Sequence, residues 1–235
     1  IVAFASALRL EPVKFRSVSI PLFPTAIISK NAGLYLPVLV RHSGATMIWT
    51  FWPLFLRDEI GLDLLHIAFI QATNAGTQLL VMFAMGDRLS SRHALLGGLV
   101  LSGLTFFSFT LAHSFWELWP TQMLLAASWA LIYVGGLVRL DEENVEKATA
   151  NGLFWSVIAL SAIIGPLCAT VLIQFTDYRG LMMLAGLLAF ASTGIYLALE
   201  GRAGAGEKPG GAQHGTAPGK QRRRGHQVLP PTPLR

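Results

Sequence analysis

The sequence predicts an all-α, polytopic membrane protein whose chain crosses the bilayer six times. Apolar side chains make up 53% of the 235 residues and charged side chains only 13%, whereas ordinary globular domains carry about a quarter charged residues. The charged residues lie mainly in short segments between long apolar stretches. Each stretch approaches the roughly 20 residues that a helix needs to cross about 30 Å of hydrocarbon, where a helix satisfies its own backbone polar groups.

Six apolar stretches meet this requirement, and short polar connections separate them. They are Leu34–Leu56, Leu64–Met85, Ala94–Ala112, Leu118–Val138, Gly152–Phe175 and Leu181–Leu199. The connections carry charged residues and glycines, which favour turns. Because such short connections make neighbouring helices antiparallel, both ends of the predicted domain, residues 34–199, lie on one side of the membrane.

The segments outside this domain differ from it in composition. Residues 1–33 combine basic residues with Pro12, Pro21 and Pro24, which favours a linker over a helix. Residues 200–235 are rich in Gly, Pro and Gln, and we expect them to form a disordered cytoplasmic tail. The apolar opening of the chain, which begins at Ile1, is typical of the end of a preceding helix, so we expect the sequence to be a fragment of a longer chain.

Basic residues are distributed unequally between the two sides of the predicted domain. Fifteen of the eighteen Lys and Arg residues fall on one side, Arg57 and Arg179 fall on the other, and Arg41 lies within a span. The positive-inside rule therefore places both termini in the cytoplasm. Four tryptophans agree with this orientation, because they lie toward the outer ends of their spans, where indole rings favour the interface: Trp49, Trp52, Trp116 and Trp119.

Patterns typical of an enzyme, a metal site or a nucleic-acid surface are missing from the sequence. The single cysteine, Cys168, lies in an apolar run, so no disulfide forms within the chain and no metal-ligand spacing exists. There is no H-E-x-x-H motif, paired carboxylate or Ser-His-Asp constellation. Seven basic residues lie beyond Glu200, in a segment without apolar periodicity, which argues against nucleic-acid binding. We expect no enzymatic activity, no cofactor and no metal.

The loop after the second span carries an ordered set of charges. Its run Gly86-Asp87-Arg88-Leu89-Ser90-Ser91-Arg92-His93 resembles the G-x-L-x-D-R-x-G-R-R signature of the major facilitator superfamily. Asp87, Arg88 and Arg92 match in order. Phe83 stands where the family has its first glycine, and serines replace the later Gly and Arg.

Two further features strengthen the resemblance, which covers about Asn31–Leu199. They are the charged loop Asp141–Lys147 and the pair Gly165-Pro166 in the fifth span. The resemblance implies the carboxy-terminal six-helix half of a twelve-helix secondary transporter, which moves a small-molecule substrate across the cell (plasma) membrane by alternating access. The implied partners are the lipid bilayer and a missing amino-terminal half. A truncated protein that does not transport, or a six-span membrane enzyme, is the alternative.

The charged loop is a candidate gating latch. A carboxylate at the end of one helix can accept hydrogen bonds from the start of a neighbouring helix, and the resemblance implies that the partner of Asp87 lies in the other half. Arg88 and Arg92 belong to the same candidate. The alternative is a simple helix-end turn that obeys the positive-inside rule. In the fifth span, Gly165 and Pro166 predict a kink, because proline removes a backbone hydrogen bond.

Polar and aromatic residues on three spans are candidates to line a substrate cavity. In the family, the first, second, fourth and fifth helices of a half can line it, near the bilayer midplane. The second span carries Gln71, Asn74 and Gln78 on one helical face. The fourth and fifth spans add Trp129, Tyr133 and Trp155. The alternative is that the amides join helices by hydrogen bonds and that the aromatic rings only pack.

Arg41 and His42 are the strongest individual candidates. A charge in the hydrocarbon costs at least about 2.5 kcal/mol unless it is paired or hydrated. Arg41 is therefore a candidate to bind an anionic substrate or to pair with an acidic residue of the missing half, and His42 is a candidate to carry a coupling proton. Alternatively, Arg41 snorkels to the headgroups and His42 bonds a neighbouring helix.

Overall fold

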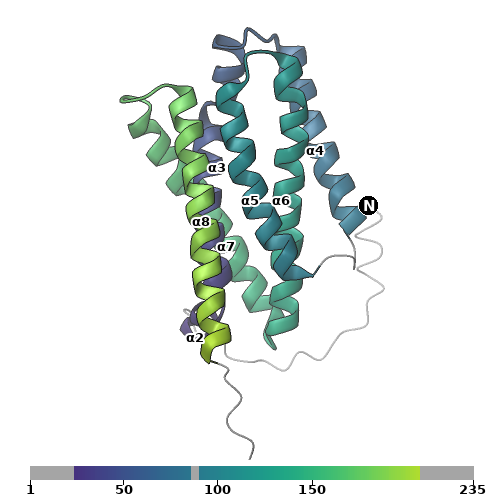
Figure 1. Cartoon of the computed structure of the whole chain (residues 1–235), viewed down its shortest axis with the longest axis vertical. Coiled ribbons are helices and arrows are strands. Elements are labelled where there is room, and N and C mark those ends of the chain that lie inside the picture. The colour runs from purple at the N-terminus through teal and green to yellow at the C-terminus, as the bar shows by residue number, and fades with distance from the viewer. Residues whose placement is uncertain (1–23, 86–89, 207–235) are drawn as a thin grey trace, which may run out of the picture.

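The computed structural model describes residues 24–85 and 90–206, and the regular elements in these ranges are α-helices (Figure 1). A short helix precedes six long ones. Their bounds are α2 Thr25–Lys30, α3 Ala32–Asp58, α4 Leu64–Met85, α5 Ser91–Leu111, α6 Phe115–Glu143, α7 Lys147–Leu172 and α8 Tyr178–Gly206. The all-α prediction is confirmed for the described residues.

Five of the long helices, α4 to α8, have the length and apolar composition of a membrane span. They coincide with the second to sixth predicted spans. Helix α3 is 27 residues long, which is ample for a crossing at 1.5 Å per residue. Its composition is less apolar because it contains Arg41, His42 and two prolines, Pro37 and Pro53. The first predicted span is thus a helix, and its crossing of the membrane remains a prediction.

The structure changes the predicted boundaries at both ends of the domain. Within the predicted linker, residues Thr25–Lys30 form the short helix α2. Pro24 stands just before the first turn of this helix, where a proline does not disturb it. At the other end, α8 continues to Gly206, so the first residues of the predicted tail are helical. Residues 1–23 and the tail from residue 207 lie outside the described residues.

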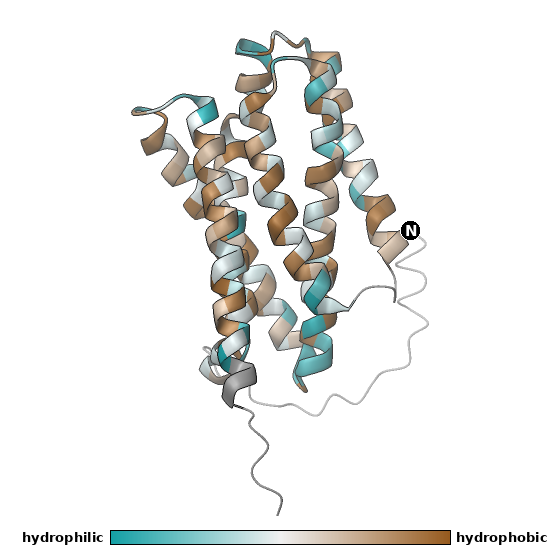
Figure 2. Cartoon of the chain, in the orientation of Figure 1, coloured by the Kyte–Doolittle hydropathy of each residue, from teal (hydrophilic) through white to brown (hydrophobic). Residues whose placement is uncertain are grey.

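The six long helices pack in the order α4, α6, α5, α8, α3, α7 (Figure 1). Helices α4 and α7 stand at the two ends of this series. In their most apolar stretches only 6% and 17% of the residues are buried, against 44–50% for α5, α6 and α8. Apolar residues run along the middle of the helices, and polar residues gather at the helix ends (Figure 2). Four helices therefore form the core, and α4 and α7 flank it.

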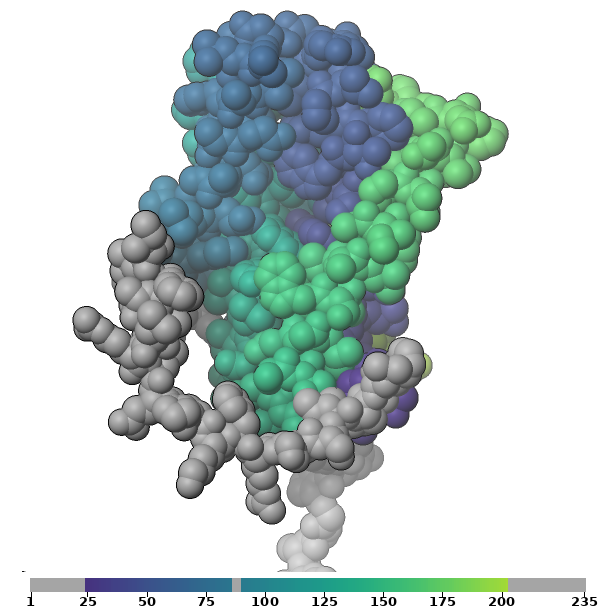
Figure 3. All heavy atoms as spheres, turned by 180° about the vertical axis from the view of Figure 1, so that it is seen from behind, coloured from purple at the N-terminus to yellow at the C-terminus, as the bar shows by residue number. Residues whose placement is uncertain are grey.

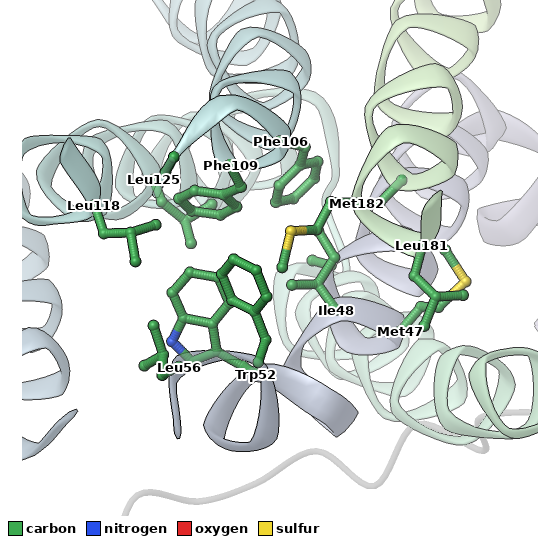
Figure 4. Close-up of a cluster of buried hydrophobic side chains, with 14 of the residues drawn as sticks. Met47, Ile48, Trp52, Leu56, Phe106, Phe109, Leu118, Leu125, Leu181 and Met182 are labelled. Carbon is green, nitrogen blue, oxygen red and sulfur yellow. The ribbon is translucent and has the colours of Figure 1, made fainter. Parts of the chain in front are cut away.

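Buried apolar side chains form two clusters along the bundle. The first lies toward the α3–α4 turn and includes Trp52 and Phe109, whose ring centroids are 4.8 Å apart (Figure 4). The second lies toward α2 and includes Leu99 and Phe154. Trp52 is 0% exposed, so its predicted place at the membrane interface is wrong: its side chain packs inward from α3 against α5. Trp116 is 72% exposed.

Helices α3 and α7 approach each other closely at Gly165. A Cβ atom at this position would lie 2.5 Å from Ser43 O and 2.8 Å from Met47 N, and closer still to the Thr46 hydroxyl. Thr46 Oγ1 donates a hydrogen bond to Ser161 O across the same contact, at 2.8 Å. Close crossings at small residues are a common way to join helices in membranes. The helix continues through Pro166, and the kink remains a prediction.

We therefore expect Gly165→Ala to destabilise the bundle by about 1–3 kcal/mol, because the added methyl group overpacks the α3–α7 contact. Unfolding in mixed micelles by titration with SDS, followed by circular dichroism, measures this change. Gly152→Ala on the same helix is the matched control, because a Cβ atom there would meet nothing within 4 Å. Equal stability of the two variants would contradict the prediction.

Candidate functional site

The guanidinium group of Arg41 lies inside the bundle. The residue is 2% exposed and stands on α3 between the two apolar clusters, after Val38 and before Ala45. The side chain turns inward toward α5 and α6, so the alternative in which it snorkels to the headgroups does not describe this structure. Its Cζ atom lies 5.4 Å from the centroid of the Phe106 ring and 5.3 Å from that of Trp129.

Two serine hydroxyls hold the guanidinium group. Arg41 Nε donates to Ser102 Oγ at 2.8 Å, and Arg41 Nη2 donates to Ser128 Oγ at 3.3 Å. The hydroxyl of Ser102 donates to Gly98 O on its own helix, at 2.9 Å, and that of Ser128 donates to Leu125 O, at 2.7 Å. Because these hydrogens are bonded to the backbone, the oxygen lone pairs face the cation and act as acceptors.

The serines supply dipoles but no charge to balance Arg41. Among residues 24–85 and 90–206, the ion pairs join other groups, and no carboxylate lies within salt-bridge distance of Arg41. The Nη1 atom has no hydrogen-bond partner in the same ranges. The polar layer between the apolar clusters therefore carries a net positive charge within this part of the chain.

His42 and Trp129 form a stacked pair beside this charge. Their ring centroids are 4.6 Å apart and their planes meet at 25°. The Nδ1 atom of His42 is buried and has no hydrogen-bond partner in the described part of the chain. Stacking fixes the imidazole ring against α6 and leaves a ring nitrogen free to bind a proton or a polar group.

A cavity of about 210 Å³ lies between α3, α4 and α6 next to these groups. Four polar and four apolar residues line it: Arg41, His42, Asn74 and Gln78, and Trp49, Leu125, Ala126 and Trp129. Figure 3 shows the face of the bundle that carries α4 and α7, which is hollowed between these two helices. Asn74 Nδ2 donates to Gln122 Oε1 at 3.2 Å, which ties α4 to α6 beside the cavity.

Five of the eight predicted cavity residues line this one cavity: Arg41, His42, Asn74, Gln78 and Trp129. The other three lie elsewhere. Gln71 is exposed on α4. Tyr133 packs one turn beyond Trp129, at 5.9 Å between ring centroids, and Trp155 is 54% exposed and touches Tyr133 edge-on. Of the three amides on α4, Asn74 and Gln78 thus line the cavity and Gln71 does not.

The three candidate latch residues are only partly visible. Asp87 and Arg88 lie outside the described residues, and Arg92 is exposed in the first turn of α5. The latch therefore remains a prediction.

Sequence analysis missed four residues of this site: Ser102, Ser128, Gln122 and Trp49. The third span is not among the helices expected to line the cavity, yet Ser102 on that helix accepts a hydrogen bond from Arg41. One available signal was depth, since Arg41, Ser102 and Ser128 all lie within about one turn of the middle of their helices. Within residues 24–85 and 90–206, no group of His, Cys, Asp or Glu side chains is placed to hold a metal ion.

Removing one serine should destabilise the bundle only while the charge is present. We expect Ser102→Ala to cost about 1–3 kcal/mol, the usual effect of leaving a buried charged donor without its acceptor. In an Arg41→Met background the same change should be nearly neutral, so SDS-titration measurements on the four proteins of this cycle isolate the interaction. Ser108→Ala is the control, because that hydroxyl bonds only Thr105 O of its own helix. An equal effect of Ser102→Ala in both backgrounds would refute the assignment.

Comparison with known protein sequences gives the family of the chain. No curated protein sequence matches the chain. The family model described as Major Facilitator Superfamily matches residues 34–232, which is most of the chain and includes all the residues that line the cavity. The chain therefore belongs to the Major Facilitator Superfamily, a family of membrane transporters.

Proposed function

We propose that this protein is a secondary active transporter of a small solute, working by alternating access, and that α3–α8 form the carboxy-terminal half of a twelve-helix bundle. The observation that carries the proposal is the cavity between α3, α4 and α6, lined by a buried cation, an imidazole and two amides. Secondary transporters bind their substrates near the midplane, between two structural repeats. The cavity adjoins Arg41, which lies between the two apolar clusters and thus at mid-depth.

The exposed surface of α4 and α7 supports a second half that covers the cavity. Apolar residues such as Leu80 and Phe83 on α4 and Ile163 on α7 are more than half exposed. Contact with lipid alone would be favourable for these apolar side chains. The side chains of Asn74 and Gln78 on α4 line the cavity, and exposure of polar groups to lipid is unfavourable. An amino-terminal six-helix half on this face would exclude lipid from the cavity.

The positive-inside rule supports an orientation with the α2 end in the cytoplasm of a plasma-membrane protein. At that end, Arg139 on α6 forms ion pairs with Glu143, at 3.0 Å, and with Glu200 on α8, at 2.5 Å. In this orientation the predicted latch of Asp87, Arg88 and Arg92 faces the cytoplasm. The unpartnered Nδ1 of His42 supports that residue as the carrier of a coupling proton.

Alternating access predicts that one cavity position is reachable from both sides of the membrane. In a Cys168→Ser background, which removes an exposed thiol, we expect Gln78→Cys to react with an impermeant maleimide added to either side of oriented vesicles. The complete reading frame that contains this chain is the protein to test. Thr105→Cys is the control, because residue 105 is 1% exposed and should stay unlabelled. Labelling of Gln78→Cys from one side only, under every condition of pH and ion gradient, would contradict alternating access.

The proposed orientation makes a separate prediction about the two ends of the bundle. In the same background, Glu142→Cys at the end of α6 should be labelled only from the cytoplasmic side, and Thr176→Cys before α8 only from outside. Both positions are exposed, so accessibility of the side chain does not limit the reaction. Labelling of both from one side would show that the number of crossings between them is even and would refute this topology.

A further inference from the structure

We propose that the ligand of the cavity is a small organic anion, a monocarboxylate whose charged group pairs with Arg41 and whose apolar part lies against Trp49, Leu125 and Trp129. This inference rests on the proposed transport function and names the substrate class of the same site. Three observations carry it: the unbalanced charge, the hydrogen-bond donors without partners and the apolar part of the lining.

The first observation is the unbalanced charge of Arg41. The guanidinium group is 2% exposed and its two hydrogen bonds go to neutral hydroxyls. Buried charges in proteins are normally paired, and in residues 24–85 and 90–206 no carboxylate pairs with this one. By contrast, Arg139 and Arg179, both partly buried, each bond a glutamate. Arg41, which has no such partner, lines the cavity.

The second observation is a pair of hydrogen-bond donors near the cavity that have no partner in the described ranges. Arg41 Nη1 has no partner in the described ranges. The Nε2 amide of Gln122, a residue that is 0% exposed, is also without a partner there and lies beside Asn74 of the lining. Arginine presents five N–H donors in a planar fork that matches a carboxylate. A ligand that supplies acceptors at its polar end would pair with the guanidinium group of Arg41, which lines the cavity.

The third observation is the composition of the remaining wall. The apolar part of this wall includes Trp49, Leu125 and Trp129. Arg41 is the permanently charged residue among those that line the cavity. The volume of about 210 Å³ equals that of about seven water molecules at about 30 Å³ each. A cavity of this volume with a partly apolar wall suits a short alkyl chain or a single ring. While His42 is neutral, Arg41 carries the only charge among the residues that line this cavity, so a monoanion is favoured over a dianion.

Direct binding measurements test this inference without requiring transport. The protein from the complete reading frame is purified in detergent, and titration calorimetry measures the binding of benzoate, butyrate and lactate. Benzamide is the neutral match for benzoate. We expect at least one of the three acids to bind, and expect the neutral match to bind at least about tenfold more weakly, because charge-assisted hydrogen bonds are lost.

Variants then assign the binding to Arg41. We expect Arg41→Gln to weaken carboxylate binding at least about tenfold and Arg41→Lys, which keeps the charge, to weaken it less. Arg139→Gln is the matched control, because that arginine is paired at the α2 end of the bundle, and should bind as the unmodified protein does. Trp129→Phe, which keeps an aromatic ring but alters the wall, should reduce affinity and serves if Arg41→Gln does not fold.

Three results would overturn the inference: none of the three acids binds, the neutral match binds equally well, or Arg41→Gln and Trp129→Phe both leave the affinity unchanged. A lack of binding combined with a loss of stability in Arg41→Gln would instead indicate that an acidic residue outside the described ranges pairs with Arg41. Labelling of Gln78→Cys from both sides in the same preparation separates the two proposals. If labelling from both sides persists while no acid binds, the proposed transport function is supported and the proposed anionic ligand is refuted.

Discussion

A single buried cation, Arg41, determines how the centre of this bundle is built. The charge stands between two apolar clusters, at a depth where an unpaired cation costs at least about 2.5 kcal/mol. Two serines from two other helices reduce this cost with their hydroxyl dipoles. The aromatic faces of Phe106 and Trp129 reduce it further. Hydrogen bonds from this one side chain thereby join α3 to α5 and α6, and Arg41 also lines the cavity.

The helices divide into two groups by the way they pack. Helices α3, α5, α6 and α8 bury much of their surface against one another, and the close crossing at Gly98 brings the backbones of α5 and α6 together where a Cβ atom would collide. Helices α4 and α7 bury little of their apolar stretches. The first group provides a firm wall for the cavity. The second is left with the surface available to another part of a larger bundle.

Sequence patterns predicted the helices far better than their faces. Five spans agree with helices of the right length and composition, because the apolar run that a bilayer requires is a strong signal. The periodicity is weak in helices that are apolar all round, so the inward direction of Trp52 was not predictable from its position near a helix end. Arg41 and His42 stood out because charged and titratable groups are rare in hydrocarbon. Ser102 and Ser128 did not, because a hydroxyl that bonds its own backbone is common in membrane helices and gains significance only when three helices meet.

The modest hydropathy of α3 bears on how the protein reaches its membrane. During synthesis, helices enter the bilayer one after another from the translocon, and a central arginine weakens the partition of a single segment into lipid. The hydroxyls that solvate Arg41 lie on α5 and α6, which emerge from the ribosome only after α3 and α4. If α3 crosses the membrane as proposed, we expect its stable insertion to depend on sequence made later, and a chain interrupted before Ser102 would lack both hydroxyls that bond Arg41.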